Sequence, residues 1–479
     1  MKSGIESNLK SIFIIILILM IVLILAACIK QSEKSVGIKK NIEANITDVL
    51  VDGENCRGAH VSTRPHNRKV VYHIPTKTWF VFYGTGHWME KLGEDGGQKE
   101  FIAWRSSVNG KTFSSFSPAI VGNGHSSSTD VLLVSNRIYI VNTRWGFWRK
   151  KAGIPWKQDG KIYYHRGTPD RPLFYVPYEI FLFDIVDGRL TAGEKAEALP
   201  GDQHVRHAGP HYGSITRDTN GYIWAAARAL TGEKGLATWV ARTCRPDDIM
   251  DWKPYHSLFK SSGPGSHAPQ IIALDEEKVV CVLFAKYEKM TMVFLFNPDS
   301  GNWEKPHIIG KGYQSKRASA VFDPGSKRLH VVYTDSAGDA RHRALSSPYS
   351  PDNWSPSLNQ PGILVAKNAG TNKGDDDLSL SANLSKNPAP LALVHRGPDL
   401  HLHLKYYDGN QWSPKDIKAG LQDPEWICDE ASAIADFSNG LGFLYWSGWK
   451  DPEIRKEKDN IGQLRFCLIK DVESLFVNR

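Results

Sequence analysis

The stretch HYGSITRDTNGYIWAAARA, residues 211–229, has the pattern of a strand, a turn and a second strand. Asp218 to Gly221 form the turn, because Asp and Asn side chains bond nearby backbone amides and Gly adopts turn conformations at no steric cost. The apolar run that follows predicts a buried strand. His211 and Tyr212 at the opening, and Arg228 near the close, are the side chains of this hairpin that a simple strand does not require.

The same organisation recurs seven times along the chain: a small or polar opening, a strand, a turn and a second strand. The openings are found, in chain order, at His60, His125, His211, His267, Arg317, Asp377 and Glu430. Units of this kind, roughly 50 to 60 residues long, are typical of propeller blades. Hardly any segment after residue 55 has a helical pattern. We therefore predict an all-β chain that forms a seven-bladed β-propeller of four-stranded antiparallel blades over residues 55–479.

The composition is that of a folded globular protein, with 41% hydrophobic and 23% charged residues in a chain of 479. Length alone would allow two or three domains. The net charge of +8 arises from scattered Lys and Arg rather than from a basic block. We therefore expect no nucleic-acid partner, whereas an acidic ligand is favoured. The 15 Trp and 17 Tyr residues suit carbohydrate stacking and β-rich cores alike, and we expect a monomer.

The N-terminus has an unbroken apolar run from Ile12 to Ala27, which is short for a membrane span and typical of a signal-peptide core. The run ends in Leu25-Ala-Ala-Cys28, which resembles a bacterial lipobox. That resemblance implies a signal peptide over residues 1–27 and a lipid on the Cys28 thiol, followed by a tether to residue 54. The protein would then be extracytoplasmic and lipid-anchored to a bacterial membrane, at the outer membrane or cell surface. The alternative is an uncleaved signal anchor with a chance cysteine.

Five further cysteines follow Cys28, and an odd number leaves at least one of them unpaired. Disulfides are permitted outside the cytoplasm. Cys281 lies within the strand-like VVCVLFA and is expected to be a buried apolar filler. Because no CxxC spacing occurs, a thiolate zinc site is not expected.

The segment Ser107-Val-Asn-Gly-Lys-Thr-Phe113 resembles the Asp-box, or BNR repeat, of sialidase-like propellers, with Asn where Asp is usual. Its Gly turn would let Ser and Thr side chains cap neighbouring backbone groups while the aromatic ring packs between strands. This is a folding motif without catalytic meaning.

The openings of the seven units should crowd one rim of the propeller, because the first strand of each blade lines the central axis. Four of them begin with His, and others supply Arg317, the acidic run Asp375 to Asp377, and Asp429 with Glu430. We place the candidate site on this rim, since function follows the site rather than the fold. Each of these residues could instead be an ordinary cap, turn or ion-pair residue.

Arg, His and Tyr are the groups that β-elimination on a uronic acid requires. A fixed cation neutralises the sugar carboxylate, a base then removes the C5 proton, and an acid protonates the leaving oxygen at C4. Tyr212 and Arg228 would lie on adjacent strands and reach the axis together. A sialidase would instead need three arginines to clamp a carboxylate, and the supply of Arg at the unit openings is thin.

The chain resembles the seven-bladed propeller ulvan lyases of polysaccharide lyase families 24 and 25, through His125, Tyr212 and Arg228 and the overall architecture. The resemblance implies that Arg228 neutralises the uronate while His125 and Tyr212 share the acid and base roles. Those enzymes use a second His one strand later, where this chain has Arg144 and Trp145. Further substrate contacts are expected from His211, His267, Arg317, Arg144 and Trp145.

Two other functions stay open. One is a sialidase-like hydrolase that uses carboxylates such as Asp130, Asp377 and Glu430. The other is a glycan-binding propeller that grips sugar with the rim histidines and the tryptophans of the insertion after Arg144. The chemistry requires no cofactor, although His204, His207 and His211 leave a structural calcium or zinc ion open.

Overall fold

The computed structural model describes residues 20, 45–53, 68–85, 101–120, 129–143, 157–158, 161–162, 178–199, 211–231, 235–253, 256–261, 267–285, 287–311, 318–369, 378–451, 454 and 462–476. Asp48–Arg479 forms one compact unit, and Met1–Thr47 is counted separately. Among the described residues, none belongs to a helix with the length and apolar character needed to cross a bilayer. The apolar run that ends before Cys28 lies outside these residues, apart from Met20.

Seven antiparallel sheets make up the propeller, as the sequence predicts. Blade 1 consists of β2 (Val70–His73), β3 (Thr78–Thr85), β4 (Phe101–Ser107) and β5 (Ser117–Ile120). Blade 2 consists of β6 (Asp130–Val134), β7 (Arg137–Thr143), β10 (Tyr178–Val186) and β11 (Arg189–Leu199). Blade 3 consists of β12 (His211–Arg217), β13 (Ile223–Thr231), β14 (Gly235–Arg245), β15 (Asp248–Trp252) and β16 (His256–Lys260). A separate pair, β8 (Lys157–Gln158) and β9 (Lys161–Ile162), lies within the insertion of the second unit.

The other four blades repeat this plan, and in blades 3 to 5 the outermost strand comes in two pieces. Blade 4 consists of β17 (His267–Ala273), β18 (Val279–Ala285), β19 (Met290–Asn297), β20 (Asn302–Trp303) and β21 (His307–Lys311). Blade 5 consists of β22 (Ser319–Asp323), β23 (Arg328–Thr334), β24 (Ala340–Ser346), the 3-10 turn η3 (Pro351–Asn353), β25 (Trp354–Ser355) and β26 (Ile363–Ala366). Blade 6 consists of β27 (Leu378–Ala382), β28 (Leu391–Arg396), β29 (Leu402–Tyr407) and β30 (Ile417–Ala419). Blade 7 consists of β31 (Trp426–Ala433), β32 (Leu441–Trp449), β33 (Gln463–Ile469) and β1 (Ile46–Asp52), and η4 (Glu473–Leu475) follows it.

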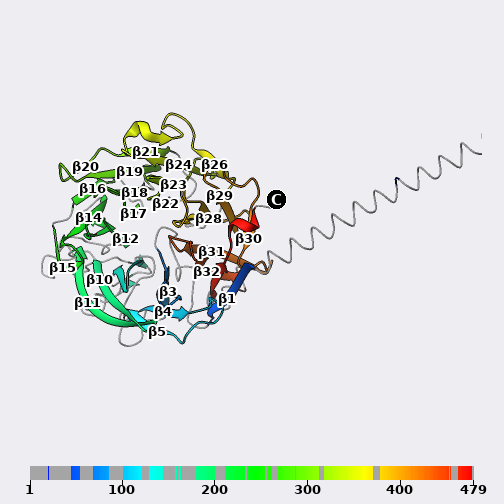
Figure 1. The fold of residues 1–479 in the computed structure, drawn as a ribbon. Helices are drawn as coiled ribbons and strands as arrows, with labels where there is room; N and C mark the ends of the chain where they lie inside the picture. The colour runs from blue at the N-terminus through cyan, green and yellow to red at the C-terminus, as the bar shows by residue number, and fades with distance from the viewer. Residues whose placement is uncertain are drawn as a thin grey trace, which may run out of the picture. The chain divides into compact units, whose positions relative to one another are not determined.

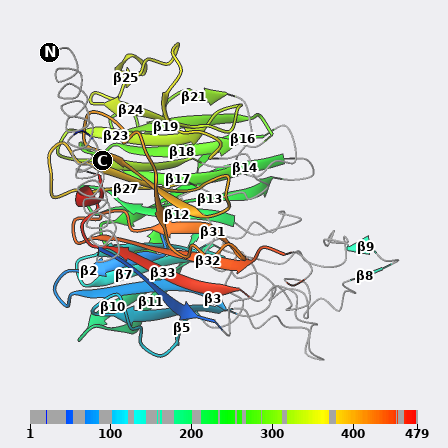
Figure 2. The ribbon, with the colours of Figure 1, turned by 90° about the vertical axis from the view of Figure 1, so that its right-hand side faces the viewer.

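The blades are arranged radially, with β12, β17, β22 and β31 close to the centre and β11, β15 and β21 at the periphery (Figure 1). Seen from the side, the strands run across the thickness of the ring (Figure 2). Apolar side chains fill the space between neighbouring blades. Ile180 and Tyr178 of blade 2, for example, pack with Ile215 and Ala225 of blade 3. The core of this protein is therefore a set of sheet-on-sheet interfaces.

The ring is closed by β1, which comes from the start of the chain and pairs with β33 as the outermost strand of blade 7. Asp52 accepts hydrogen bonds from the Tyr83 hydroxyl at 3.0 Å and from Arg105 Nη2 at 3.1 Å, both in blade 1. This closure also corrects an expectation, because β1 falls inside residues 28–54, which were expected to be a tether. A seven-residue strand whose partner lies at the other end of the chain has no local pattern that distinguishes it from a linker.

In the turn at Ser107–Phe113 the Ser107 hydroxyl accepts the Gly110 amide at 2.9 Å, as expected of a serine cap, and Asn109 adds further caps. The Asn109 side-chain oxygen accepts hydrogen bonds from the Lys111 and Thr112 amides at 2.8 and 3.0 Å. Phe113 packs edge-on against Phe466 of blade 7, with ring centroids 5.2 Å apart. The turn thus links blade 1 to its neighbour, which is a structural role.

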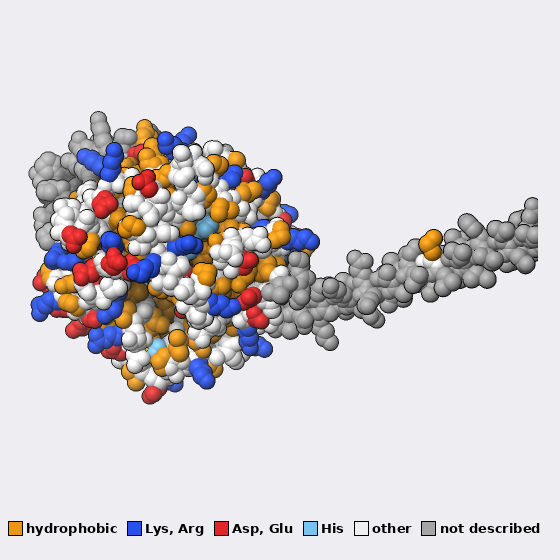
Figure 3. Space-filling model, turned by 45° about the horizontal axis from the view of Figure 1, so that its top comes forward, with side chains coloured by type: hydrophobic (Ala, Val, Ile, Leu, Met, Phe, Trp, Pro, Cys, Tyr) orange, Lys and Arg blue, Asp and Glu red, His pale blue; other side chains and the backbone are white. Residues whose placement is uncertain are grey.

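The four described cysteines are Cys244, Cys281, Cys428 and Cys467, and none of them forms a disulfide. Cys281 is fully buried in β18, as expected of an apolar filler, and burial raises the pKa of its thiol. Basic and acidic side chains are interspersed over the described surface of the face in Figure 3. This agrees with the scattered charge of the sequence.

Candidate functional site

A ring of hydrogen bonds around the axis joins the first strands of all seven blades. At six junctions a backbone amide donates to a side chain of the neighbouring blade, over 2.8 to 3.2 Å. The pairs, with the amide first, are Ile215 to Asp130, Ile271 to Ser214, Ala320 to Gln270, Leu380 to Ser319, Ala433 to Ser379 and Lys69 to Ser432. At the seventh, the Val131 amide donates to the Arg68 carbonyl. The ring aligns the strand openings, so it also places the rim residues.

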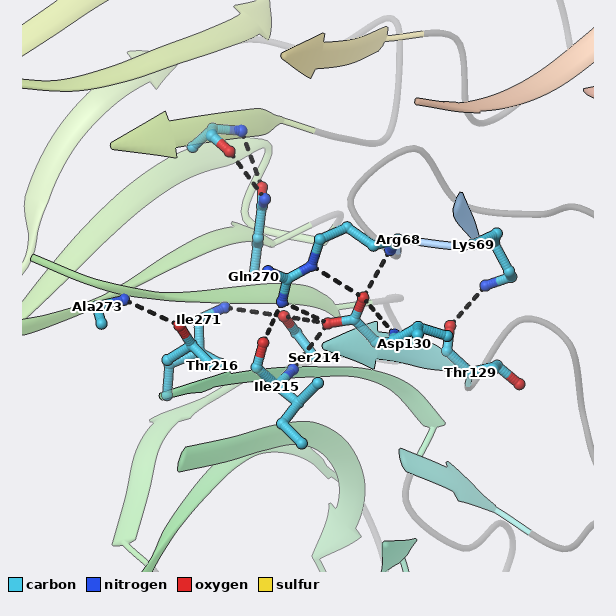
Figure 4. Close-up of polar contacts among 12 residues, drawn as sticks. Arg68, Lys69, Thr129, Asp130, Ser214, Ile215, Thr216, Gln270, Ile271 and Ala273 are labelled. Carbon is cyan, nitrogen blue, oxygen red and sulfur yellow. Dashed lines mark hydrogen bonds and ion pairs between the residues drawn. The ribbon is translucent and has the colours of Figure 1, made fainter. Parts of the chain in front are cut away.

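Asp130 of the ring accepts several hydrogen bonds from blades 1 and 3. Its carboxylate is fully buried and accepts the Arg68 amide at 2.6 Å and Arg68 Nη2 at 3.1 Å. It also accepts the Ser214 hydroxyl at 3.1 Å and the Ile215 amide at 2.8 Å. Arg68 itself extends further and donates to the Ile215 carbonyl. Blades 1, 2 and 3 are thereby tied together through one ion pair (Figure 4).

Immediately before Ser214, the backbone of β12 forms a bulge that presents Tyr212. The pairing with β13 is regular from Ser214 onward, and it shifts between His211 and Ser214. Tyr212 adopts φ 54°, a left-handed conformation that is costly for a residue with a side chain. Bulges redirect side chains, and strained backbone concentrates at functional positions. Tyr212 is therefore a candidate on geometric grounds as well as by its chemistry.

Gly213 makes this bulge possible because Tyr178 of blade 2 lies directly against it. A Cβ atom at position 213 would come within 1.5 Å of the Tyr178 hydroxyl. Tyr178 is completely buried, and this burial, together with the nearby charge of Asp130, raises the pKa of its phenol well above the usual value. Tyr178 is thus an uncharged side chain that packs against the bulge at Gly213.

Arg228 and Tyr212 are brought together, as the sequence predicts. Arg228 on β13 is the ladder partner of His211, and its Cζ lies 4.4 Å from the centroid of the Tyr212 ring. Tyr212 has only 8% of its surface exposed, while Arg228 is half-buried. A cation stacked on a phenol ring at the rim can meet an anionic ligand with the guanidinium while the phenol stays close by.

A similar stack lies at the other end of the same hairpin. Arg242 Cζ lies 4.3 Å from the Tyr222 ring, beside the turn that joins β12 to β13. Stacking alone is therefore no mark of a functional pair. What distinguishes Tyr212 from Tyr222 is the left-handed bulge at the strand opening.

Several charged side chains of the described residues lie near the openings of blades 1 to 3. Arg68, Lys69 and Arg228 carry positive charge, and Arg68 forms an ion pair with Asp130. Lys69 is fully buried, and its Nζ donates to the Thr129 carbonyl at 2.5 Å. A partly exposed guanidinium at a strand opening, such as that of Arg228, can bind an anionic ligand.

Blade 7 opens with the same bulge but with a carboxylate at the tip. Glu430 adopts φ 55°, and the pairing of β31 with β32 shifts between Asp429 and Ser432. Counting back from the ring serines, Glu430 occupies the position of Tyr212. Arg396 of blade 6 forms an ion pair with Asp429 at 2.8 Å, and all three charged residues are buried. This part of the rim bears two carboxylates and one guanidinium.

The remaining predicted site residues lie partly or wholly outside the described residues. The backbones of His211 and His267 open β12 and β17. The residues outside the described ranges are His125, Arg317, Arg144, Trp145, Asp375 to Asp377, Cys28, His204 and His207. Within the described ranges, no group of three or more His, Cys, Asp or Glu side chains could hold a metal ion.

Sequence reasoning missed the ring residues and the role of Asp130, which it considered as a hydrolase carboxylate. A signal was present, because four of the seven units carry a serine at the same place: Ser214, Ser319, Ser379 and Ser432. Aligning the units on those serines would have placed Asp130 at the equivalent position of the second unit.

No known protein family matches the chain, and no curated protein does. Solved structures that resemble it include a protein of unknown function from Dyadobacter fermentans, at 12% identity over 88% of this chain and 98% of that chain, with a TM-score of 0.46. Trypanosoma rangeli sialidase bound to 2,3-difluorosialic acid shares 14% identity over 90% of this chain and 59% of that chain, with a TM-score of 0.45. The BP39L lectin from Burkholderia pseudomallei shares 12% identity over 80% of this chain and 96% of that chain, with a TM-score of 0.47. The likeness to sialidase and lectin propellers concerns the fold alone.

Proposed function

We propose that the protein cleaves an acidic, uronate-containing polysaccharide by β-elimination, in the manner of ulvan lyases, at the rim of blade 3. The observation that carries this proposal is the Tyr212–Arg228 pair, with the guanidinium 4.4 Å from the ring centroid of a tyrosine held in a left-handed bulge. A cation and a phenol are the groups that proton abstraction next to a carboxylate needs.

In the proposed reaction, Arg228 binds the sugar carboxylate and neutralises its charge, which makes the C5 proton acidic. A base removes that proton, the electron pair forms the C4–C5 double bond, and the bond from C4 to its oxygen breaks. The leaving oxygen takes a proton from an acid. Tyr212 stands close enough to Arg228 to serve one of these two proton transfers, and His125 is proposed for the other.

The local charge supports an acidic substrate. Arg228 is a half-buried guanidinium at the opening of blade 3, beside Tyr212. A uronate polymer carries a carboxylate on its sugar units, so it would be attracted to this side of the rim. The substrate class therefore follows from the same residues as the chemistry.

One of the carboxylates considered for the sialidase-like alternative, that of Asp130, is already bound within the ring of hydrogen bonds. Asp130 is fully buried and accepts hydrogen bonds from Arg68, Ser214 and Ile215, so it has a structural task already. Glu430 lies at the left-handed bulge of blade 7, so a substitution of Glu430 can test the hydrolase alternative.

A glycan-binding propeller is the second candidate. The observation in its favour is that blade 3 also holds Arg242 over Tyr222, a second stack with nearly the same spacing. If the rim stack were of the same kind, Tyr212 and Arg228 would only support a sugar ring.

The proposed function is tested by incubating the purified full-length chain with a panel of uronate polysaccharides, ulvan among them. Elimination leaves a conjugated double bond that absorbs ultraviolet light, and hydrolysis does not. We expect absorbance to rise with the wild-type chain and to stay flat with Arg228→Ala. New reducing ends without absorbance would support the hydrolase, and binding without either signal would support the glycan-binding propeller.

We also propose that the chain is exported and anchored by lipid on Cys28. Feeding cells an alkyne-tagged fatty acid should label the wild-type chain. Loss of the label in Cys28→Ala would agree with this anchor, and an unlabelled wild-type chain would contradict it.

A further inference from the structure

The ion pair between Arg68 and Asp130 is more than the propeller ring requires. At four other junctions the ring contact is a serine hydroxyl that accepts an amide, at Ser214, Ser319, Ser379 and Ser432. Burying an ion pair in such a place is a poor way to gain stability, because both charges must leave water. A second role for this pair is therefore worth seeking.

The pair holds the residues that directly follow the Tyr212 bulge. Asp130 Oδ2 accepts the Ser214 hydroxyl at 3.1 Å and the Ile215 amide at 2.8 Å. Arg68 donates to the Ile215 carbonyl, so both polar groups of the Ile215 backbone are bound. Figure 4 shows Arg68 lying across Asp130 toward this strand. The strand is thus held by hydrogen bonds at Ser214 and Ile215, two and three residues after Tyr212.

Tyr178, which like Asp130 belongs to blade 2, packs against the bulge at Gly213. Its hydroxyl fills the place where a side chain of residue 213 would stand. The three residues that follow Tyr212 are therefore each in contact with blade 2, Gly213 with Tyr178 and Ser214 and Ile215 with Asp130. A left-handed residue persists only where its surroundings determine its conformation in this way.

We propose that Arg68 and Asp130 are positioning residues that hold Tyr212 against Arg228. This inference rests on the proposed function where it concerns catalysis, but the geometry of Tyr212 can be measured without any reaction. Small displacements of a reacting group lower turnover steeply, by about a hundredfold for roughly 1 Å. Weakening the hydrogen bonds of Arg68 and Asp130 should therefore lower kcat while leaving substrate binding by Arg228 in place.

The kinetic test compares Asp130→Asn with Ser319→Ala in the full-length chain. Asn keeps the size of Asp but removes the charge that holds Arg68, and Ser319→Ala removes a ring hydrogen bond at blade 5. We expect Asp130→Asn to lower kcat by about ten- to a hundredfold with KM changed less than about threefold. Ser319→Ala should keep the wild-type kcat. Equal kcat values in the two variants would overturn the proposal, because the ring contact would then be merely structural.

A second readout does not depend on catalysis. With 3-fluorotyrosine incorporated, the fluorine resonance of Tyr212 is identified by its loss in Tyr212→Phe. We expect that resonance to shift or broaden in Asp130→Asn and to stay unchanged in Ser319→Ala. If the wild-type chain eliminates no polysaccharide but the resonance responds in this way, the proposed function fails while the positioning role stands. An unchanged resonance in Asp130→Asn would overturn the positioning role.

Arg68→Lys provides the variant to use if Asp130→Asn does not fold. Lys keeps the charge but lacks the planar fork that reaches both Asp130 and Ile215. We expect the same change of the Tyr212 resonance, with a smaller loss of kcat. A wild-type resonance and kcat in Arg68→Lys would count against the proposal.

Discussion

Blades 3 and 7 open with the same backbone distortion and present different chemistry from it. Tyr212 and Glu430 have φ values of 54° and 55°, and both precede a ring serine by two residues. In blade 3 the tip is a phenol stacked with Arg228. In blade 7 the tip is a carboxylate, and the adjacent Asp429 pairs with Arg396 of blade 6.

The difference lies in what supports each bulge. The blade 3 bulge rests on Tyr178 and on the ion pair of Arg68 with Asp130. In blade 7 the residue that corresponds to Ile215 is Ala433, whose amide donates to the Ser379 hydroxyl of blade 6. The bulge of blade 3 is thus the catalytic candidate, because a cation and a proton-transfer group lie side by side there and the strand is held by neighbouring residues.

The largest expected effect is on kcat for elimination, and it distinguishes Tyr212 of blade 3 from Glu430 of blade 7. Tyr212→Phe should lower kcat for elimination by about a hundred- to ten-thousandfold, because the phenol hydroxyl is lost as a proton-transfer group. Glu430→Gln should lower it by less than about tenfold. Steady-state kinetics on a uronate polysaccharide measure both.

Tyr222→Phe is the matched control for this experiment, since Tyr222 stacks with Arg242 in the same blade but away from the strand opening. It should retain the wild-type kcat. If Glu430→Gln abolished activity while Tyr212→Phe did not, blade 7 would be the catalytic station and the comparison would be reversed.

The next effect concerns stability on the blade 7 side. Arg396→Met leaves the buried carboxylate of Asp429 without its guanidinium partner, which should lower the free energy of unfolding by about 3 kcal/mol. Urea unfolding followed by tryptophan fluorescence gives this value. A loss of elimination activity in the folded variant, rather than of stability, would show that this pair serves the reaction.

A smaller effect is expected from the residue that follows each tip. Gly213→Ala forces a Cβ against the Tyr178 hydroxyl and should lower the free energy of unfolding by about 1 to 3 kcal/mol. The equivalent residue in blade 7 is already Ala431, and Ala431→Gly should cost at most about 1 kcal/mol. Thermal unfolding of the two variants, measured side by side, checks the contrast. Similar losses would mean that the two bulges are supported alike.

The last effect is that of pH, and it acts on neither bulge. Burial lowers the pKa of His330 to about 4 and that of its neighbour His342 well below the usual value. Between pH 6.5 and 4 the unfolded chain therefore binds protons that the folded chain does not. The free energy of unfolding should fall by about 1.4 kcal/mol per pH unit for each such proton as pH decreases, and be fully regained above pH 6.5.

Urea unfolding at several pH values measures this slope, which His330→Gln should reduce. A slope that is unchanged in this variant would assign the acid sensitivity to other groups. Because the effect is global, the kinetic comparison of Tyr212 with Glu430 belongs above pH 6.5.

The blades could be predicted from the sequence because their signals are local. Strands such as RIYIVNT and VVCVLFA are rich in β-branched residues, and Gly, Asn and Asp mark the turns between them. The meeting of Tyr212 with Arg228 followed from the same hairpin, since a short turn fixes which residues face each other. Local pattern was sufficient for both.

The remainder depends on contacts between distant segments. The pairing of β1 with β33 joins the two ends of the propeller, and Asp130 meets Ser214 of the next blade. No local pattern distinguishes a buried structural Asp from a catalytic one. The roles of His125, Arg317, Arg144 and Trp145 stay predictions, as do those of the His211 and His267 side chains.

The most direct test of the central claim is a crystal structure of Tyr212→Phe with a bound uronate oligosaccharide. The account predicts a sugar carboxylate within hydrogen-bonding distance of the Arg228 guanidinium, with C5 facing the ring of residue 212. An oligosaccharide bound beside Glu430 and Arg396, or on the outer strands of the blades, would contradict it.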